Sequence, residues 1–174
     1  HQNPTLLSDT EGIWLHNLVW GGINAGGQLE SYWFYEHLYQ LNEDGNYLFD
    51  HRWHFRPYYN FISTIPLNNG RYQDIEAITS TDQLRAWGQK DLVQGCAHLW
   101  IQNTQHTWKH VVDDDPTAAV SGTVAFDGLQ PAGAYTLEWW NTYQTDPEQQ
   151  LLRSEPVAAD ANGTVTVSVD DLST

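Results

Sequence analysis

The sequence feature that most constrains the fold is a series of short segments in which apolar and polar residues alternate. The segment 134–140, Ala-Tyr-Thr-Leu-Glu-Trp-Trp, follows a turn rich in proline and glycine and stops at a second turn, at Asn141 and Thr142. The segment 164–169 follows an Asn-Gly turn and places three valines on one face. An alternation with a period of two predicts strands that turn one face toward a core.

Similar segments recur throughout the part of the chain that follows residue 67. Short strands separated by turn signals are typical of an antiparallel β-sandwich, in which two layers bury their inner faces against each other. The sequence therefore predicts a sandwich over residues 67–174. We expect its strands near residues 76–78, 83–87, 96–102, 122–126, 134–140, 151–156 and 164–169.

The beginning of the sequence has a different, helical pattern. Ser8 and Glu11 have the spacing of a capping box, in which a hydroxyl and a carboxylate satisfy free amides at the start of a helix. Apolar residues then recur on more than one side of the segment as far as Ile23, and two glycines follow at positions 26 and 27. This pattern predicts a mostly buried helix that ends at the two glycines.

A strand, a loop and a second helix are expected next. Residues 31–35 form a short aromatic run that is rich in strand formers, and we interpret residues 36–54 as a loop. Pro57 suits the first turn of a helix, and apolar residues then recur with helical spacing until Pro66 ends it. The turn-rich residues 67–71 join this helix to the strands.

These patterns resemble the carboxy-terminal region of clan-A-type glycoside hydrolases, in which a small β-sandwich follows the last unit of a (β/α)8 barrel. The segment 11–20, Glu-Gly-Ile-Trp-Leu-His-Asn-Leu-Val-Trp, is similar to the helix before the eighth barrel strand, and the segment 31–35, Ser-Tyr-Trp-Phe-Tyr, is similar to that strand. The segments 97–108 and 128–142 are similar to the sandwich.

The resemblance implies a mixed α and β fold in two parts. Residues 1–66 are expected to be the remnant of the end of a glycosidase-like (β/α)8 barrel. Residues 67–174 are expected to form the antiparallel β-sandwich. In the resembled families a further apolar strand follows the position of residues 170–174, so the sandwich is expected to be truncated at its last strand.

The function that the resemblance implies is hydrolysis of a polysaccharide or oligosaccharide by a retaining, two-carboxylate mechanism. At 174 residues the chain is too short for a complete barrel, which needs about 200 residues or more. Both catalytic carboxylates of the resembled enzymes fall before position 1, so we expect no catalytic residue here and no turnover by this chain alone. The expected partners are a carbohydrate and the missing amino-terminal part of the same barrel. No cofactor is implied, and the expected location is extracellular or at the cell surface.

Two residues are candidates for substrate binding by the same resemblance. Trp33 matches the aromatic platform on which the sugar stacks, because an indole can cover the apolar C–H face of a pyranose. Packing in a core is the alternative, since its neighbours in the run are also aromatic. Glu36 is placed to hydrogen-bond sugar hydroxyls, although an exposed loop carboxylate is more often only solvated. Glu30, at the other end of the expected strand, is a weaker candidate.

The composition excludes several classes of partner. Seven basic and 22 acidic residues give a net charge of −15, which disfavours binding to nucleic acids and to anionic membranes. No apolar run approaches the length of a membrane span. Cys96 is the single cysteine, so the chain contains no internal disulfide, and its apolar surroundings suggest an unreactive core thiol.

No metal site is expected from the ligand-type residues. Asp50, His51 and His54 lie within five positions, but a zinc site would need further ligands from distant residues such as His37. A role in loop hydrogen bonding or toward substrate is the better interpretation. The acidic run at residues 113–115 is more typical of a solvated loop than of a calcium site. His16, on the predicted helix, is interpreted as a core or interface histidine.

Two alternative functions remain open. The chain could be a non-catalytic carbohydrate-binding or structural sandwich module, in which Trp108, Trp139 and Trp140 stack on glycans. The adjacent Trp139 and Trp140 point to opposite faces of their strand, so only one of them can enter the core. A remote alternative is a copper-dependent polysaccharide monooxygenase that binds copper through His1, but a helix is expected soon after this histidine.

Overall fold

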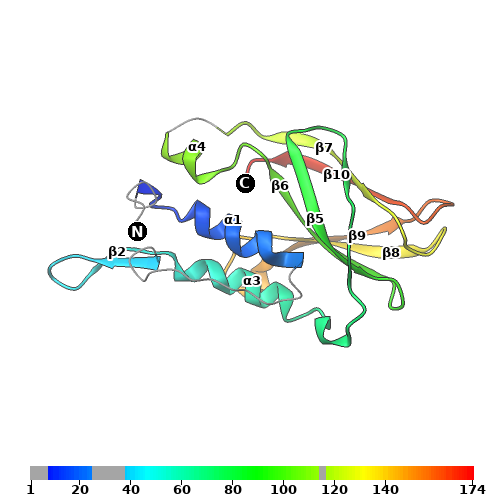
Figure 1. Ribbon diagram of the computed structural model, residues 1–174, viewed down its shortest axis with the longest axis horizontal. Coiled ribbons are helices and arrows are strands. Elements are labelled where there is room, and N and C mark those ends of the chain that lie inside the picture. Colours follow the sequence, from blue (N-terminus) through cyan, green and yellow to red (C-terminus); the bar gives the residue numbers. More distant parts are fainter. Residues whose placement is uncertain (1–7, 25–37, 114–116) are drawn as a thin grey trace.

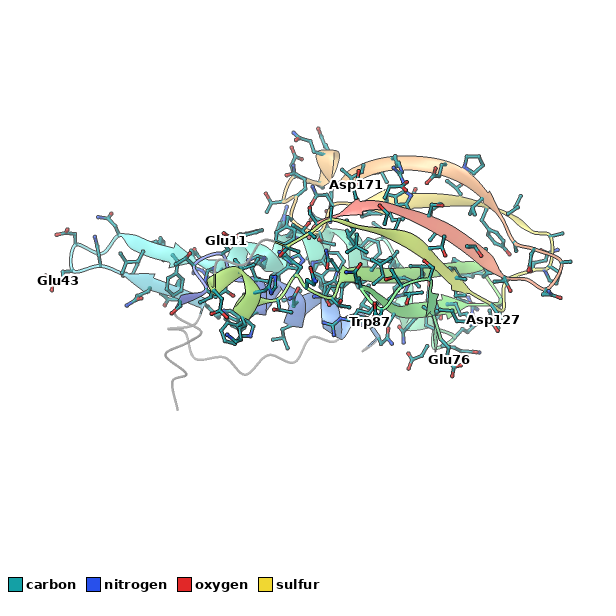
Figure 2. All side chains as sticks on the ribbon, turned by 90° about the horizontal axis from the view of Figure 1, so that it is seen from above. Glu11, Glu43, Glu76, Trp87, Asp127 and Asp171 are labelled. Carbon is teal, nitrogen blue, oxygen red and sulfur yellow. The ribbon has the colours of Figure 1, made fainter. Side chains whose placement is uncertain are left out.

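The computed structural model describes residues 8–24, 38–113 and 117–174. This part of the chain is a mixed α and β protein that consists mainly of antiparallel strands in several sheets, with few helices. Helices α1 and α3 lie side by side at one end of the molecule, next to the strands (Figure 1). The β1–β2 hairpin projects from the helical end, and Glu43 marks its tip (Figure 2).

The helical end contains the elements that precede residue 70. They are α1 (Ile13–Gly21), the 3-10 turn η2 (Gly22–Asn24), β1 (Tyr39–Leu41), β2 (Tyr47–Asp50), the 3-10 turn η3 (His51–His54), α3 (Phe55–Ile62) and the 3-10 turn η4 (Leu67–Asn69).

Helix α1 is buried as predicted, but its capping differs from the prediction. Six of its nine residues are buried, and they lie on more than one side of the helix, as the apolar pattern predicts. The helix begins at Ile13 and not directly after Ser8. The cap is the buried carboxylate of Asp9, which accepts a hydrogen bond of 2.8 Å from the backbone amide of Trp14. The residue just before the helix, Gly12, has a left-handed conformation with φ 72°. The two glycines expected to end the helix lie outside the described residues, and α1 itself ends at Gly21.

The predicted loop at residues 36–54 contains regular structure. Its described part forms the antiparallel β1–β2 hairpin and the η3 turn. The alternation in these strands is weak because both strands are largely exposed. The second helix, α3, starts before the predicted proline, so that Pro57 occupies its third position. This position is still within the first turn, where a missing backbone N–H costs no helical hydrogen bond.

Eight strands follow the helical end and confirm most of the predicted strand positions. They are β3 (Gln73–Asp74), β4 (Ile78–Thr79), β5 (Leu84–Asp91), β6 (Cys96–Asn103), β7 (Val120–Phe126), β8 (Ala134–Trp140), β9 (Leu151–Ala158) and β10 (Val165–Leu172). Two short helices, α4 (Trp108–Val112) and α5 (Pro147–Gln150), lie in the connections. The strands form the sheets β10-β7-β4, β3-β5-β6 and β8-β9, and all pairs are antiparallel.

The burial predicted for one face of β10 is confirmed. Its three valines are buried against β7, β5 and neighbouring residues in an aliphatic cluster. Leu99 and Ile101 of β6 also face this cluster, as their alternation predicts, but they are only partly buried. The buried members of the cluster are Ile75, Leu84, Val120, Val124, Phe126, Leu129, Ala159, Val165, Val167 and Val169.

A second cluster joins the helices to the strands. Trp100 of β6 is buried together with the apolar residues of α1, and Trp87 of β5 packs beside it. The sheet β3-β5-β6 therefore packs against the cluster around β7 and β10 with one face and against the helices with the other. The buried members of this second cluster are Trp14, Leu15, Val19, Trp20, Ile23, Tyr58 and Trp100.

Candidate functional site

The binding residues expected from the sequence lie outside the described part of the chain. Trp33 and Glu36 are among residues 25–37, and so are Glu30 and the aromatic run that predicted a strand. His1 also lies outside the described part of the chain. Their roles stay predictions, and the candidate site below is built from other residues.

A surface hollow of about 390 Å³ lies at the base of the β1–β2 hairpin. Its lining comes from the segment before α1, from β2, from η3 and from the connection between β8 and α5. Figure 2 shows Glu11 beside the base of the hairpin. The lining contains aromatic rings, two carboxylates and a few other side chains. Its residues are Thr10, Glu11, Ile13, Leu48, Phe49, Asp50, His51, Trp53 and Tyr143.

The arginine Arg52 fixes the polar wall of the hollow. Its guanidinium donates two hydrogen bonds to the carboxylate of Asp50, at 2.8 and 2.7 Å, and a third of 2.8 Å to the hydroxyl of Tyr47. It also lies 4.7 Å from the ring centre of Tyr39. The hydrogen bonds from Arg52 hold the pKa of Asp50 below its usual range. Asp50 is therefore an ionised acceptor in a fixed orientation.

The indole of Trp53 is the aromatic wall of the hollow. It stacks on the imidazole of His54, with 3.7 Å between the ring centres, and its centre is 6.1 Å from that of Tyr143. The side chain of Trp53 nevertheless remains 38% exposed. A large apolar ring is thus held by its neighbours while part of it stays open to solvent. Such a ring can cover the apolar face of a ligand.

Buried histidines lie beneath the hollow. The ring of His16 on α1 is 5.4 Å from that of His54, and His54 is 6.1 Å from His51. One ring nitrogen of His54, Nε2, is 2.9 Å from the carbonyl oxygen of Glu11. Gly12 is necessary for this approach, because a Cβ atom there would be 2.6 Å from Nδ1 of His51 and 2.8 Å from Nε2 of His54.

Tyr143, in the connection between β8 and α5, contacts the buried histidines from the strand half of the molecule. Its ring stacks on that of His16, with centres 3.8 Å apart and planes 6° from parallel. Its hydroxyl is buried and has no hydrogen-bond partner among the described residues, and the same is true of Nδ1 of His16. Burial, together with the negative charges of Glu11 and Asp9, raises the pKa of Tyr143.

Burial keeps the histidines neutral. Burial, together with the positive charges that His54 and His106 can carry, lowers the pKa of His16 to about 2. Burial also lowers the pKa of His54 to about 4 and lowers those of His51 and His106. At neutral pH these imidazoles are therefore uncharged hydrogen-bonding groups and packing surfaces.

The described residues contain no cluster of three or more histidine, cysteine or acidic side chains suited to a metal ion. Asp50, His51 and His54 are near one another in sequence, but Asp50 is bound to Arg52 and the two imidazoles turn into the interior. A further expected ligand, His37, is outside the described range.

The tryptophans considered as an alternative glycan surface on the sandwich have other contacts. The indole N–H of Trp139 donates to Glu155 at 2.7 Å, and Arg153 lies 5.0 Å from the centre of one of its rings. Trp140 meets the ring of Phe61 on α3, whereas Trp139 packs toward the sandwich core. The two residues thus point to opposite faces, as predicted. Trp108 packs against the aromatic cluster of the helices.

The sequence pointed to only part of this hollow. The segment 50–54 contains residue types that can bind a metal, and the sequence analysis did not single out Trp53, which lies in the same segment. The position of Trp53 between two histidines was the available signal. Tyr143 had none, because it reaches His16 from 127 positions away along the chain.

No protein-family model matches the chain, and neither a curated protein nor a solved structure is significantly similar to it. None of the helices in the described ranges is both long and apolar enough to cross a bilayer.

Proposed function

We propose that this chain is part of a glycoside hydrolase that acts on a polysaccharide or oligosaccharide, and that the hollow at Trp53 binds a sugar unit. The observation that carries the proposal is the partly exposed indole of Trp53 at a hollow that also contains the carboxylates of Glu11 and Asp50. A pyranose has an apolar C–H face and a rim of hydroxyls. The indole can cover the face, and the carboxylates can accept hydrogen bonds from the rim.

The proposed reaction is hydrolysis with retention, by two carboxylates supplied by residues outside this chain. In this proposal residues 1–66 belong to the end of a barrel and residues 67–174 form the packing sandwich. Apolar side chains exposed on α1, on the β1–β2 hairpin and on α3 support a partner at the helical end, which we propose to be the remainder of the barrel. They include Leu18, Leu41, Tyr47, Leu48 and Tyr59.

Titration calorimetry of the chain with soluble gluco-, manno-, xylo- and galacto-oligosaccharides tests sugar binding. We expect at least one of them to bind, and Trp53→Ala to weaken that binding at least about tenfold, which corresponds to about 1.4 kcal/mol. Tyr59→Ala is the matched control, because Tyr59 is 62% exposed but lies outside the hollow. Equal affinity of the wild type and the Trp53 variant would place the sugar elsewhere.

Hydrolysis is measured on the same chain with chromogenic glycosides of these sugars. We expect no turnover, because the proposal assigns both catalytic carboxylates to residues outside the chain. Robust hydrolysis would contradict this assignment. Absence of binding to every oligosaccharide would contradict the function itself.

A further inference from the structure

An apolar cavity of about 590 Å³ lies inside the sandwich, away from the hollow at Trp53. Its volume is in the range of about 300 to 1,000 Å³ that is typical of ligand pockets. Strands β6 and β8 form two of its walls, and the valines of β10 form a third. The side chains that β6 and β8 turn toward the sandwich core are only partly buried, although most are apolar: Ala97, Leu99, Ile101, Tyr135, Leu137 and Trp139.

The two strands beside the cavity each have an unpaired edge. Within the described residues β6 pairs only with β5, and β8 pairs only with β9. No backbone hydrogen bond joins β6 to β8 in this part of the chain. Alternate residues of an edge strand turn their N–H and C=O groups away from the strand they pair with. The cavity is thus bordered by backbone donors and acceptors as well as by apolar side chains.

Helix α3 bridges these two strands at one end of the cavity. The ring of Phe61 is 6.3 Å from that of His98 on β6 and 5.5 Å from an aromatic ring of Trp140 on β8. Side chains therefore fill, at this end, the space that a neighbouring strand would occupy in a continuous sheet. His98 is only 7% exposed.

We propose that the space between β6 and β8 binds an extended peptide segment of a partner protein, which adds a strand to these edges. A peptide backbone supplies the N–H and C=O groups that the edges require, whereas a fatty chain supplies none. Every second side chain of the added strand points into the cavity, so these residues should be aliphatic. The length of β8 (Ala134–Trp140) fits a segment of about seven residues. The outward side chains should be neutral or basic, since the chain has a net charge of −15.

Amide hydrogen exchange of the whole chain, measured with and without a synthetic peptide, tests this proposal. The peptide is a heptapeptide in which valine and threonine alternate, with lysines added at its two ends. We expect the saturating peptide to slow amide exchange in β6 and β8 at least tenfold and to leave exchange in α1 unchanged. A matched peptide that is N-methylated at alternate residues keeps the side chains but loses backbone donors. We expect it not to protect these strands.

Two substitutions test the position of the peptide. Leu137→Ser, in the cavity wall, should weaken binding of the heptapeptide at least tenfold, while Ile78→Ser should leave it unchanged, because Ile78 is exposed on β4 and lies outside the cavity. If the Leu137 variant does not fold, the N-methylated peptide still decides between backbone pairing and simple apolar contact.

Three results would overturn the proposal. Equal protection by the N-methylated peptide would show that backbone pairing is not involved. Binding of dodecanoate in place of the heptapeptide would identify a lipid site. A dimer in sedimentation experiments, with β6 and β8 already protected in the absence of peptide, would identify a second copy of this chain as the occupant.

Discussion

The two hydrophobic clusters of this protein are built on opposite chemical principles. The cluster inside the strand half is mainly aliphatic: five of its ten buried members are valines, such as Val124 and Val167, and one is a phenylalanine, Phe126. The cluster between the helices and the strands is aromatic, with three buried tryptophans, and it adjoins the buried imidazoles of His16 and His54. Both are enclosed to a similar degree, so burial alone does not distinguish them.

The difference lies in the buried polar atoms. The buried residues of the cluster in the strand half are all aliphatic or phenylalanine, so their side chains carry no nitrogen or oxygen that needs a hydrogen-bond partner. Several buried side-chain nitrogen and oxygen atoms at the helical end have no hydrogen-bond partner among the described residues, and each such group costs about 1 to 3 kcal/mol. Buried polar groups without a hydrogen-bond partner are expected at sites where a protein binds a ligand. Examples at the helical end are Nδ1 of His16, Nδ1 of His54 and the hydroxyl of Tyr58, and the hydroxyl of Tyr143, which packs against this end, is a further one.

The largest test of this comparison is the substitution Gly12→Ala. Gly12 has a left-handed backbone, which costs a non-glycine residue about 1 to 2 kcal/mol. Its new methyl group would also meet His51 and His54, and overpacking costs about 1 to 3 kcal/mol more. We expect a loss of about 2 to 5 kcal/mol in urea unfolding. The control is Gly45→Ala, which has a similar φ and no atom within 4 Å. Equal losses would mean that the histidines can move away.

The pH dependence of stability tests the histidines directly. The pKa of His16 is about 2 and that of His54 about 4, whereas the ordinary value is 6.5. Below pH 6.5 the unfolded chain binds a proton at each residue and the folded chain does not, so stability falls as the pH decreases. The loss is up to about 1.4 kcal/mol per pH unit for each histidine. It continues to about pH 4 for His54 and to about pH 2 for His16.

We expect the two histidines together to lower the free energy of unfolding by about 3 kcal/mol between pH 6.5 and pH 5. This window lies above the range in which carboxylates titrate. Urea titrations at a series of pH values measure the summed loss of all the buried histidines, including His51 and His106, whose pKa values burial also lowers. The variant His16→Asn should reduce this loss by about 1.5 kcal/mol. An unchanged slope in this variant would show that His16 is not the group that resists protonation.

The smallest expected effect is that of Leu99→Ala, which is compared with a leucine of the other cluster. Leu15 of α1 is fully buried, so Leu15→Ala should cost about 2 to 5 kcal/mol. From alternation alone the same cost would be expected for Leu99→Ala, but Leu99 is partly buried and already borders the cavity. Its truncation removes fewer contacts, and we expect about 1 to 2 kcal/mol. Equal losses in thermal or urea unfolding would show that the cavity is closed in solution.

Much of the fold was predictable because it is encoded locally. The alternation at residues 134–140 and 164–169 identified β8 and β10, and apolar residues on more than one side identified the mostly buried helix α1. These signals are strong because each residue of a regular element points in a direction set by its position. The β1–β2 hairpin was missed because its strands are exposed and therefore carry little alternation.

The sequence by itself determined the strands of the sandwich, the burial of α1 and the acidic charge. The tertiary structure alone decided which polar side chains meet. Only the folded chain stacks Tyr143 on His16 and places Trp53 in the wall of the hollow. The fold also places the edges of β6 and β8 beside the same cavity. The physical reason is that periodicity reports the direction of a side chain relative to its own element. It carries no information on the partner that a distant loop or an unpaired strand edge supplies.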